Sequence, residues 1–386
     1  MTVYTRLRFH VRIVGRVPAA PAGVLVVGNH QLDLEGMIIP ATIAAQRGFR
    51  HPVVTSASTR LFEPGFLAMR LTSPLSRSLL AGFNVAPWLS RLGVRPIEDH
   101  PLSRPLLSWA FTLYCCFGPL AVTEAFESAA LQGAPINPRL TLPMLWTPAH
   151  LRWAAREITI IGIAPRYREW ARRQIRSAAE REMRALARLL AARHAVFTTP
   201  EGRLSVNGRV ARLRESLRVM MPAAEHVYVV STSYDPLRPG RLRVWVHFAP
   251  VVDAGSGLKT ALATARMLTA SHLAAAAWRD APNAPAALAL ARLDRLASAA
   301  CLAPDLARHP EAVLNQAITM LAAKVRPGQP MVDSRFAHVP DLLAYLANQW
   351  DETWDALTTS QPRYPSVSRA AAPMRVRRGH RRHRGN

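Results

Sequence analysis

The residues best suited to acid–base chemistry are a histidine and two carboxylates that follow an apolar run, residues 24–27. His30 comes just after this run, Asp33 lies three residues further on, and Glu35 lies five residues further on. An imidazole exchanges a proton near neutral pH, and a neighbouring carboxylate fixes its tautomer and stabilises the imidazolium. The pattern predicts that His30 is a general base. Helical spacing favours Asp33 as its partner, but we expect His30 in a turn before the helix, where that rule does not hold.

A second polar turn follows a second apolar run much later in the chain. Residues 195–198 lead through Thr199 into Pro200, Glu201, Gly202 and Arg203. The apolar runs are typical of buried β-strands, and in open α/β sheets the chemistry lies just beyond the carboxyl ends of strands. We therefore expect both polar turns at strand ends.

Taken in this order, the two turns resemble two motifs of the glycerolipid acyltransferases, the family of 1-acylglycerol-3-phosphate acyltransferases. The first motif of that family is Asn-His, four residues and Asp, and here Asn29-His30 is followed by Glu35 in the Asp position. The third is Phe-Pro-Glu-Gly-Thr-Arg-Ser, where this chain has Thr199 in place of Phe and an arginine, Arg203, shifted by one position. The resemblance covers roughly residues 24–252 and favours Glu35 over Asp33 as the partner of His30.

This resemblance implies transfer of a fatty acyl group from a thioester to a hydroxyl of a lysophospholipid or glycerol-phosphate acceptor. The donor would be acyl-CoA or acyl carrier protein, without a further cofactor or metal. His30 would act as the base, while Glu201 and Gly202 would order the site. Arg203 would bind the acceptor phosphate. Arg95 falls near the family's second motif, in an imperfect match, and is either a second phosphate ligand or a solvated surface arginine.

The same resemblance and the order of apolar runs predict an α/β fold, with a central, mostly parallel sheet flanked by helices. We expect the α/β domain at residues 1–255, interrupted by a helical insertion at about 100–165. An appended helical region would follow at 256–360, and a disordered basic tail at 361–386. A basic helix at 167–193 would pack on the sheet, and its arginines could also rest on anionic headgroups.

Charge and composition limit the classes of molecule that the protein is expected to bind. The chain has 49 Lys and Arg against 25 Asp and Glu, a net charge of +24, which attracts polyanions. Its three cysteines form no disulfide framework or zinc pattern, which favours a reducing compartment. Residues 105–123 carry no charge, but polar residues and a Gly-Pro pair favour a buried or interfacial helix over a membrane span. These features predict a protein peripheral to, or shallowly inserted in, the cytoplasmic face of an anionic membrane.

Two alternatives come from other classes of function. A family member that has lost catalysis would keep the fold as a lipid-binding scaffold, and the departures in the motifs favour this reading. A nucleic-acid-binding protein would explain the charge, but the sequence has no zinc module and no Gly/aromatic RNA-binding segment, so charge alone supports it.

Overall fold

The computed structural model describes residues 9–359, except 20, 33–34, 50, 52, 70–72, 82, 98–102, 136, 203, 215–216, 252–256 and 297–300. Three sequence-based expectations fall on residues outside these ranges: the pairing of Asp33, the role of Arg203, and the tail at 361–386.

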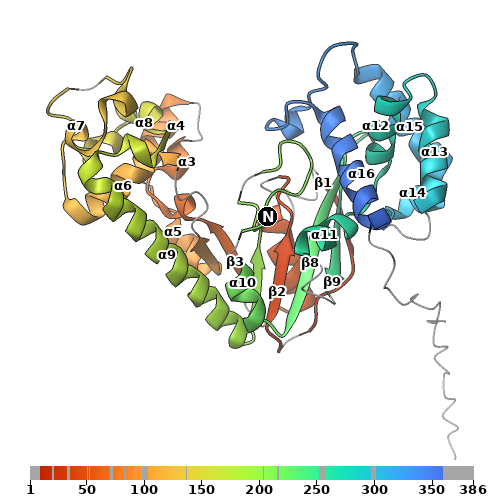
Figure 1. Cartoon of the computed structure of the whole chain (residues 1–386), viewed down its shortest axis with the longest axis horizontal. Helices are drawn as coiled ribbons and strands as arrows, with labels where there is room; N and C mark the ends of the chain where they lie inside the picture. The colour runs from red at the N-terminus through yellow and green to blue at the C-terminus, as the bar shows by residue number, and fades with distance from the viewer. Residues whose placement is uncertain are drawn as a thin grey trace, which may run out of the picture.

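A seven-stranded sheet forms the centre of the molecule (Figure 1), with the strand order β1-β9-β8-β2-β7-β3-β4. The strands are β1 (Phe9–Val14), β2 (Val24–Gly28), β3 (Val53–Ser58), β4 (Val94–Ile97), β7 (Ala195–Thr198), β8 (His226–Asp235) and β9 (Leu242–Pro250). The five strands from β8 to β4 are parallel, whereas β9 runs antiparallel to β8, and β1 runs parallel to β9. The predicted α/β class with a mostly parallel sheet is confirmed.

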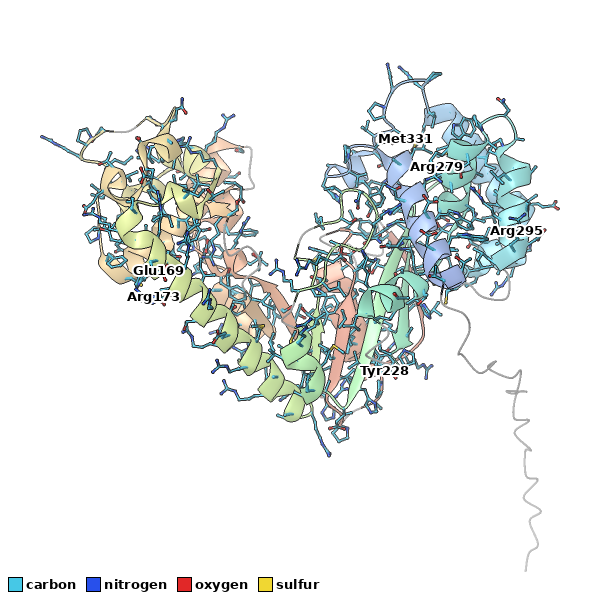
Figure 2. The ribbon with its side chains drawn as sticks, in the orientation of Figure 1. Glu169, Arg173, Tyr228, Arg279, Arg295 and Met331 are labelled. Carbon is cyan, nitrogen blue, oxygen red and sulfur yellow. The ribbon has the colours of Figure 1, made fainter. Side chains whose placement is uncertain are left out.

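Helices cover both faces of this sheet because its central strands are apolar on both sides. Every residue of β2 is buried, as expected for a strand enclosed by two layers. Its side chains alternate: Val24 and Val26 pack with α2 (Glu35–Gln46), and Leu25 and Val27 pack with α9 (Pro165–Ala191) and α11 (Leu258–Thr264). The outer side of α9 carries exposed charged residues, Arg173 and Glu169 among them (Figure 2). The predicted basic helix thus packs on the sheet.

A separate lobe stands beside the sheet, at the left of Figure 1. It contains α3 (Phe66–Met69), α4 (Pro74–Leu80), α6 (Leu106–Phe117), α7 (Val122–Ala125), α8 (Pro148–Ala154) and a small sheet of β5 (Ser103–Pro105) and β6 (Glu157–Thr159). The lobe has its own apolar core, in which Trp109 is fully buried and donates a hydrogen bond to the Ile158 carbonyl, 3.3 Å away. Ala68 and Ala81 belong to this core, so the lobe includes residues before position 100.

The uncharged segment forms α6, which is a core helix of this lobe. Leu106, Trp109 and Leu113 are fully buried on its inner side, while Tyr114 and Phe117 remain partly exposed. Phe117 packs against Tyr167 and Trp170 of α9, with ring centroids 4.9 and 4.7 Å apart. Among the helices that the structure describes, none combines the length and apolar character needed to cross a bilayer.

The described residues between 257 and 359 are mostly helical and pack against the β8–β9 end of the sheet, at the right of Figure 1. Besides α11 this region contains α12 (Ala270–Asp280), α13 (Pro285–Leu296), α14 (Pro304–Arg308), α15 (Pro310–Lys324) and α16 (Leu342–Thr359). The alanine-rich α12 is its centre, buried from Ala270 to Ala277 and packed against α13, α15 and α16. This region shares one apolar core with the sheet, so the two are a single packed body.

Within that core, a neutral histidine makes stability depend on pH. His272 is fully buried; its Nε2 lies 2.7 Å from Gln349 Oε1, and burial lowers its pKa to about 3. In the unfolded chain the imidazole of His272 is protonated below about pH 6.5, whereas in the folded protein it stays neutral down to about pH 3. The folded state is therefore favoured above pH 6.5 and loses this advantage as the pH falls towards 3. Between pH 7 and pH 5 we expect His272 alone to lower the unfolding free energy by about 2 kcal/mol. Urea titrations at both pH values measure this: His272→Gln should remove that part of the pH dependence, and the exposed control His226→Gln should keep it.

The burial of α6 gives a second test of the fold. Leu113→Ala empties a fully buried site and should lower the unfolding free energy by about 2–5 kcal/mol. Tyr114→Ala, one residue away and 41% exposed, should cost about 1 kcal/mol or less. Denaturant unfolding measures both. Equal, small effects would contradict the packing of α6 into the lobe.

Candidate functional site

The site begins where β2 ends, because Asn29 continues the pairing of β2 with β8 through its side chain. Its Nδ2 donates to the Thr232 carbonyl at 3.1 Å, and its Oδ1 accepts the Thr232 N–H at 2.8 Å. Both residues are buried. The amide thereby fixes the chain just before His30, whose side chain remains 22% exposed.

His30 is paired with Glu35, the first residue of α2. The Nδ1 atom of His30 lies 3.1 Å from Glu35 Oε2, and the Glu35 side chain is fully buried. A carboxylate only accepts hydrogen bonds, so Nδ1 carries the proton of the neutral ring and Nε2 carries the lone pair. This arrangement suits a general base that works through Nε2.

The Glu35 carboxylate is itself held by three donors. It accepts the backbone N–H groups of Gln31 and Leu32, at 3.0–3.1 Å, and the Tyr234 hydroxyl donates to its Oε1 at 2.9 Å. The two N–H groups belong to the turn that precedes α2, where a negative charge is stabilised by the helix dipole. Glu35 is therefore rigid, and it holds the His30 ring in one orientation.

The second motif joins the first at the main chain of His30. Because β7 pairs with β2, the Pro-Glu-Gly turn after β7 comes beside the turn after β2. Glu201 Oε1 accepts the His30 N–H at 2.9 Å, and the Ser205 N–H donates to the His30 carbonyl at 2.8 Å. Both sides of the His30 peptide are thus held by the downstream motif.

Glu201 also ties down the loop that follows it. Its Oε2 accepts the Ala211 N–H at 2.9 Å, so each carboxylate oxygen has its own backbone donor. Burial raises the pKa of Glu201, and the two backbone hydrogen bonds act in the opposite direction. A glutamine would place an NH2 group against one of these donors, which explains the need for a carboxylate.

Gly202 is favoured here by its backbone conformation, because its φ of +68° lies in the left-handed region that favours glycine. A Cβ at this position would lie 1.8 Å from Nη2 of Arg214, so that flexible side chain would have to move aside. The Arg214 guanidinium therefore rests directly on the Pro-Glu-Gly turn. Nothing in the sequence distinguishes this arginine among many others.

The two arginines predicted to bind phosphate, Arg203 and Arg95, are not both found at the site. Arg203 lies outside the described residues. Arg95 is exposed on β4, which is separated from β2 by β7 and β3. Three strand spacings of about 4.8 Å place β4 roughly 14 Å from β2. The structure brings His30, Glu35, Glu201 and Gly202 together, but it does not bring Arg95 to them.

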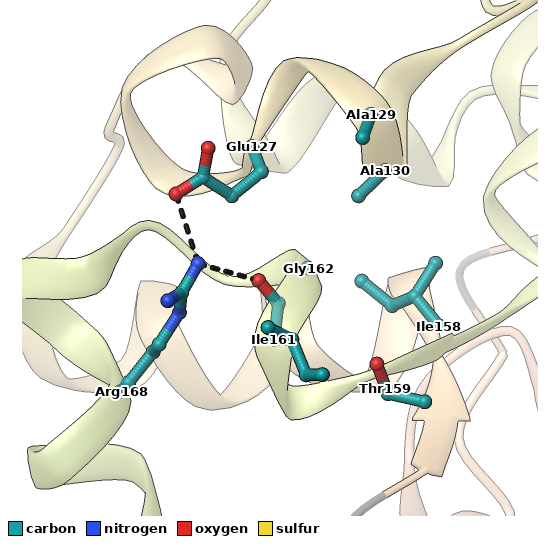
Figure 3. A pocket seen from close by; sticks show the side chains of 8 residues that line it. All are labelled: Glu127, Ala129, Ala130, Ile158, Thr159, Ile161, Gly162 and Arg168. Atoms are coloured by element: carbon teal, nitrogen blue, oxygen red, sulfur yellow. Dashed lines mark hydrogen bonds and ion pairs between the residues drawn. The ribbon is translucent and has the colours of Figure 1, made fainter.

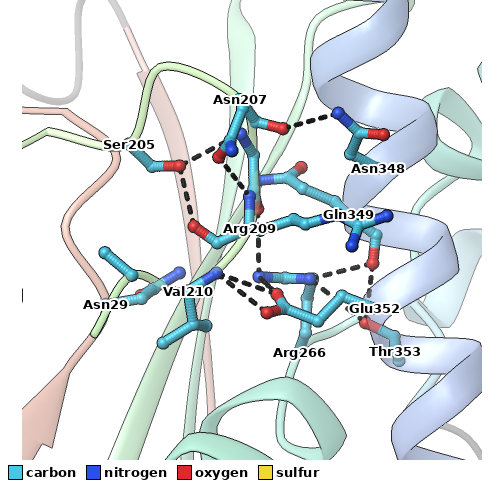
Figure 4. Close-up of polar contacts among 12 residues, drawn as sticks. Asn29, Ser205, Asn207, Arg209, Val210, Arg266, Asn348, Gln349, Glu352 and Thr353 are labelled. Carbon is cyan, nitrogen blue, oxygen red and sulfur yellow. Dashed lines mark hydrogen bonds and ion pairs between the residues drawn. The ribbon is translucent and has the colours of Figure 1, made fainter. Parts of the chain in front are cut away.

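The C-terminal helical region holds the loop after Gly202 (Figure 4). Both carboxylate oxygens of Glu352, on α16, accept the Val210 N–H at 2.9–3.0 Å. Arg266, 1% exposed, forms an ion pair with Glu352 at 3.0 Å and donates to the carbonyls of Gln349 and Gly208. This cluster anchors the loop whose Ser205 and Ala211 contact His30 and Glu201.

A second chain of contacts runs from the helical region to Glu35. The ring of Tyr234 packs edge-on against Phe336, with centroids 5.6 Å apart, and Phe336 packs against Tyr345 of α16. Tyr234 is fully buried on β8, and its hydroxyl reaches Glu35. Neither Tyr234 nor Arg266 carries a sequence signal, because each acts through residues far along the chain.

Two hollows lie outside this cluster. A groove of about 860 Å³ runs between β1 and α2, lined by apolar residues such as Val11, Met37 and Ile38, with Arg241 and Arg243 also on its wall. A hollow of about 530 Å³ lies on the lobe (Figure 3). Its Arg168 donates hydrogen bonds to the Glu127 carboxylate and to the Ile161 carbonyl. Within the described part of the chain, no cluster of three His, Cys, Asp or Glu residues could hold a metal ion.

The Arg266–Glu352 pair provides a test of this support. Glu352→Gln leaves the buried Arg266 without a carboxylate, so we expect a loss of about 3 kcal/mol in unfolding free energy and faster hydrogen exchange at the Val210 amide. Asp351→Asn is a matched control on the same helix, where the Arg279 pair is more exposed and should cost about 1 kcal/mol or less. Unchanged exchange across residues 205–211 in Glu352→Gln would show that α16 does not hold the loop.

Comparison of the chain with models of known protein families and with curated proteins found no match. The functional assignment therefore rests on the residues that meet at the ends of β2 and β7, and on their resemblance to the acyltransferase motifs.

Proposed function

We propose that this protein is an acyltransferase that moves a fatty acyl group from an acyl thioester to a hydroxyl of a lysophospholipid or glycerol-phosphate acceptor. The observation that carries the proposal is the His30–Glu35 pair, held at 3.1 Å, with the His30 peptide fixed by Glu201 and Ser205. Both motifs that resemble the family take part in this one cluster. Two unrelated short matches would not be expected to meet in this way.

The proposed reaction needs one base and one acid, and His30 supplies both. Its Nε2 takes the proton of the acceptor hydroxyl as the oxygen attacks the thioester carbonyl carbon. The C–O bond forms, and the tetrahedral intermediate then collapses with cleavage of the C–S bond. The imidazolium returns the proton to the thiolate. Glu35, buried and negatively charged, stabilises the imidazolium between these steps. The sequence has no Gly-x-Ser-x-Gly elbow, so direct transfer is proposed without an acyl-enzyme.

Cations beside the Pro-Glu-Gly turn support an acceptor that carries phosphate. The Arg214 guanidinium lies against Gly202, and Arg203 is the residue after Gly202 in the sequence. Guanidinium groups form paired hydrogen bonds with phosphate oxygens. We therefore assign acceptor binding to Arg203 and Arg214, rather than to Arg95 on the distant strand β4.

The acyl chain also has an apolar surface near the site. The groove between β1 and α2 is lined by Met37 and Ile38, which lie two and three residues after Glu35. Its size and lining suit a long hydrocarbon chain. The lipid substrates imply that the protein works peripherally at the cytoplasmic face of a membrane, where its charge of +24 favours anionic lipid.

The test is acyl transfer from labelled acyl-CoA or acyl carrier protein to a panel of lysolipids. His30→Ala should lower kcat by about 10²–10⁴-fold, the usual contribution of a positioned base. Glu35→Gln should cost nearly as much because the ring loses its orienting carboxylate, whereas Asp33→Asn serves as the control and should cost little.

Full activity in His30→Ala would overturn the mechanism. Loss in Asp33→Asn with full activity in Glu35→Gln would reverse the assignment of the carboxylate. If the wild-type protein binds lysolipid but transfers no acyl group from either donor, the scaffold alternative replaces the enzyme.

A further inference from the structure

Five large apolar side chains are exposed within a short stretch of the chain that runs from the lobe to strand β4 of the sheet. Leu75 and Leu79 on α4 are 71% and 74% exposed, and Phe83 follows at 44%. Trp88 on α5 (Ala86–Arg91) and Leu92 just after it are 61% and 75% exposed. Single exposed apolar residues are common on soluble proteins, but a concentration of this kind marks an interaction surface. We call residues 73–95 the α4–α5 segment.

The spacing of these residues places them on common helix faces. Leu75 and Leu79 are four residues apart on α4, and Trp88 and Leu92 are four residues apart at α5. Residues with this separation lie on the same side of a helix. Both helices are short, and Pro74 and Pro87 stand in their first turns. The segment therefore presents two short apolar ridges rather than one long amphipathic helix.

The charge of this stretch has one sign. Between Pro64 and Ile97 the ionisable side chains are Arg70, Arg77, Arg91 and Arg95, and no acidic residue occurs. Arg91 and Arg95 are exposed, and the Arg91 guanidinium lies 5.7 Å from the ring centre of Trp88. Strand β4, which carries Arg95, packs against the arginine-rich helix α9. Anionic partners are attracted here, and no carboxylate in this stretch opposes them.

A lipid bilayer fits this combination better than a protein groove. Leucine and tryptophan enter the boundary between headgroups and acyl chains, and arginines pair with anionic headgroups at the same depth. The most apolar stretch of the chain, α6, cannot take this role because its leucines and Trp109 form the core of the lobe. Leu75, Leu79, Trp88 and Leu92, by contrast, are exposed and therefore available to a membrane.

We propose that the α4–α5 segment binds the surface of an anionic lipid bilayer, with Leu79, Trp88 and Leu92 inserted and Arg91 and Arg95 on the headgroups. The inference rests on the proposed function for its biological use, since it would bring the enzyme to lipid substrates. The binding itself is measured without acyl transfer.

The test is co-sedimentation with vesicles of phosphatidylcholine and phosphatidylglycerol, and with vesicles of phosphatidylcholine alone. The combined variant Leu79→Gln, Trp88→Gln and Leu92→Gln changes only exposed side chains. We expect it to bind the anionic vesicles at least about tenfold more weakly than the wild type, or about 1.4 kcal/mol. Arg91→Gln with Arg95→Gln should weaken binding to the anionic vesicles and reduce its sensitivity to salt.

The matched control replaces three exposed apolar residues elsewhere: Ile161→Gln, Val219→Gln and Val332→Gln, at 64%, 41% and 71% exposure. It should bind like the wild type. An equal loss in the control would show that lipid binding does not depend on the α4–α5 segment and would overturn the proposal. The proposal would also be overturned if the combined variant of Leu79, Trp88 and Leu92, called the first variant below, bound vesicles as tightly as the wild-type protein. It would equally be overturned if the wild-type protein did not bind vesicles.

Two further measurements distinguish membrane binding by this segment from self-association of the chain and from the proposed acyl transfer. If gel filtration shows that the first variant dissociates a wild-type oligomer without losing vesicle binding, the segment is a contact between copies of the chain and the proposal fails. Acyl transfer to a short-chain acceptor in detergent should persist in the first variant. If transfer is absent in the wild type while vesicle binding still depends on the segment, the proposed function fails and the membrane surface stands.

Discussion

The carboxylate of Glu201 holds the arrangement together, because it accepts backbone N–H groups from both sides of the site. One donor is His30, in the turn after β2, and the other is Ala211, in the loop after β7. Burial raises the pKa of Glu201, so a charge here is tolerated only where both oxygens have donors. The position of His30 therefore depends on the loop, and the loop depends on whatever holds its far end.

That support comes from the C-terminal helices, by two separate routes. Arg266 and Glu352 fix the loop backbone at Gly208 and Val210. Phe336 packs on Tyr234, which donates to Glu35. One route sets the main chain of His30 and the other sets its ring. The helical region is therefore part of the site's construction, although it contributes no group to the proposed chemistry.

Sequence predicts those parts of the fold in which the structure directly causes the residue pattern. The apolar run of β2 reflects burial on both faces of the strand, and the polar turn follows where that burial ends. The spacing of the first motif selects Glu35, which lies against His30. The hydrogen bonds of Glu201 could not be predicted, because backbone donors have no residue-type signature. Arg214 and Arg266 were equally hidden among the arginines. The exposure of Leu79 and Trp88 could not be predicted either, since the same residue types fill the core of the lobe.

The edge strand β1 has a consequence for how the chain is made. Phe9 pairs with Leu242, so the first described strand has no neighbour until more than half of the protein has been synthesised. At about 5–20 residues per second, the ribosome needs roughly 10–50 s to cover that distance. For that time β1, in which apolar and polar residues alternate, has left the exit tunnel without its partner strand, and β2 waits in the same way for β7. Such a chain exposes unpaired strand edges to other nascent chains, so its yield during synthesis should depend on chaperones that cover the first strands until the last ones arrive.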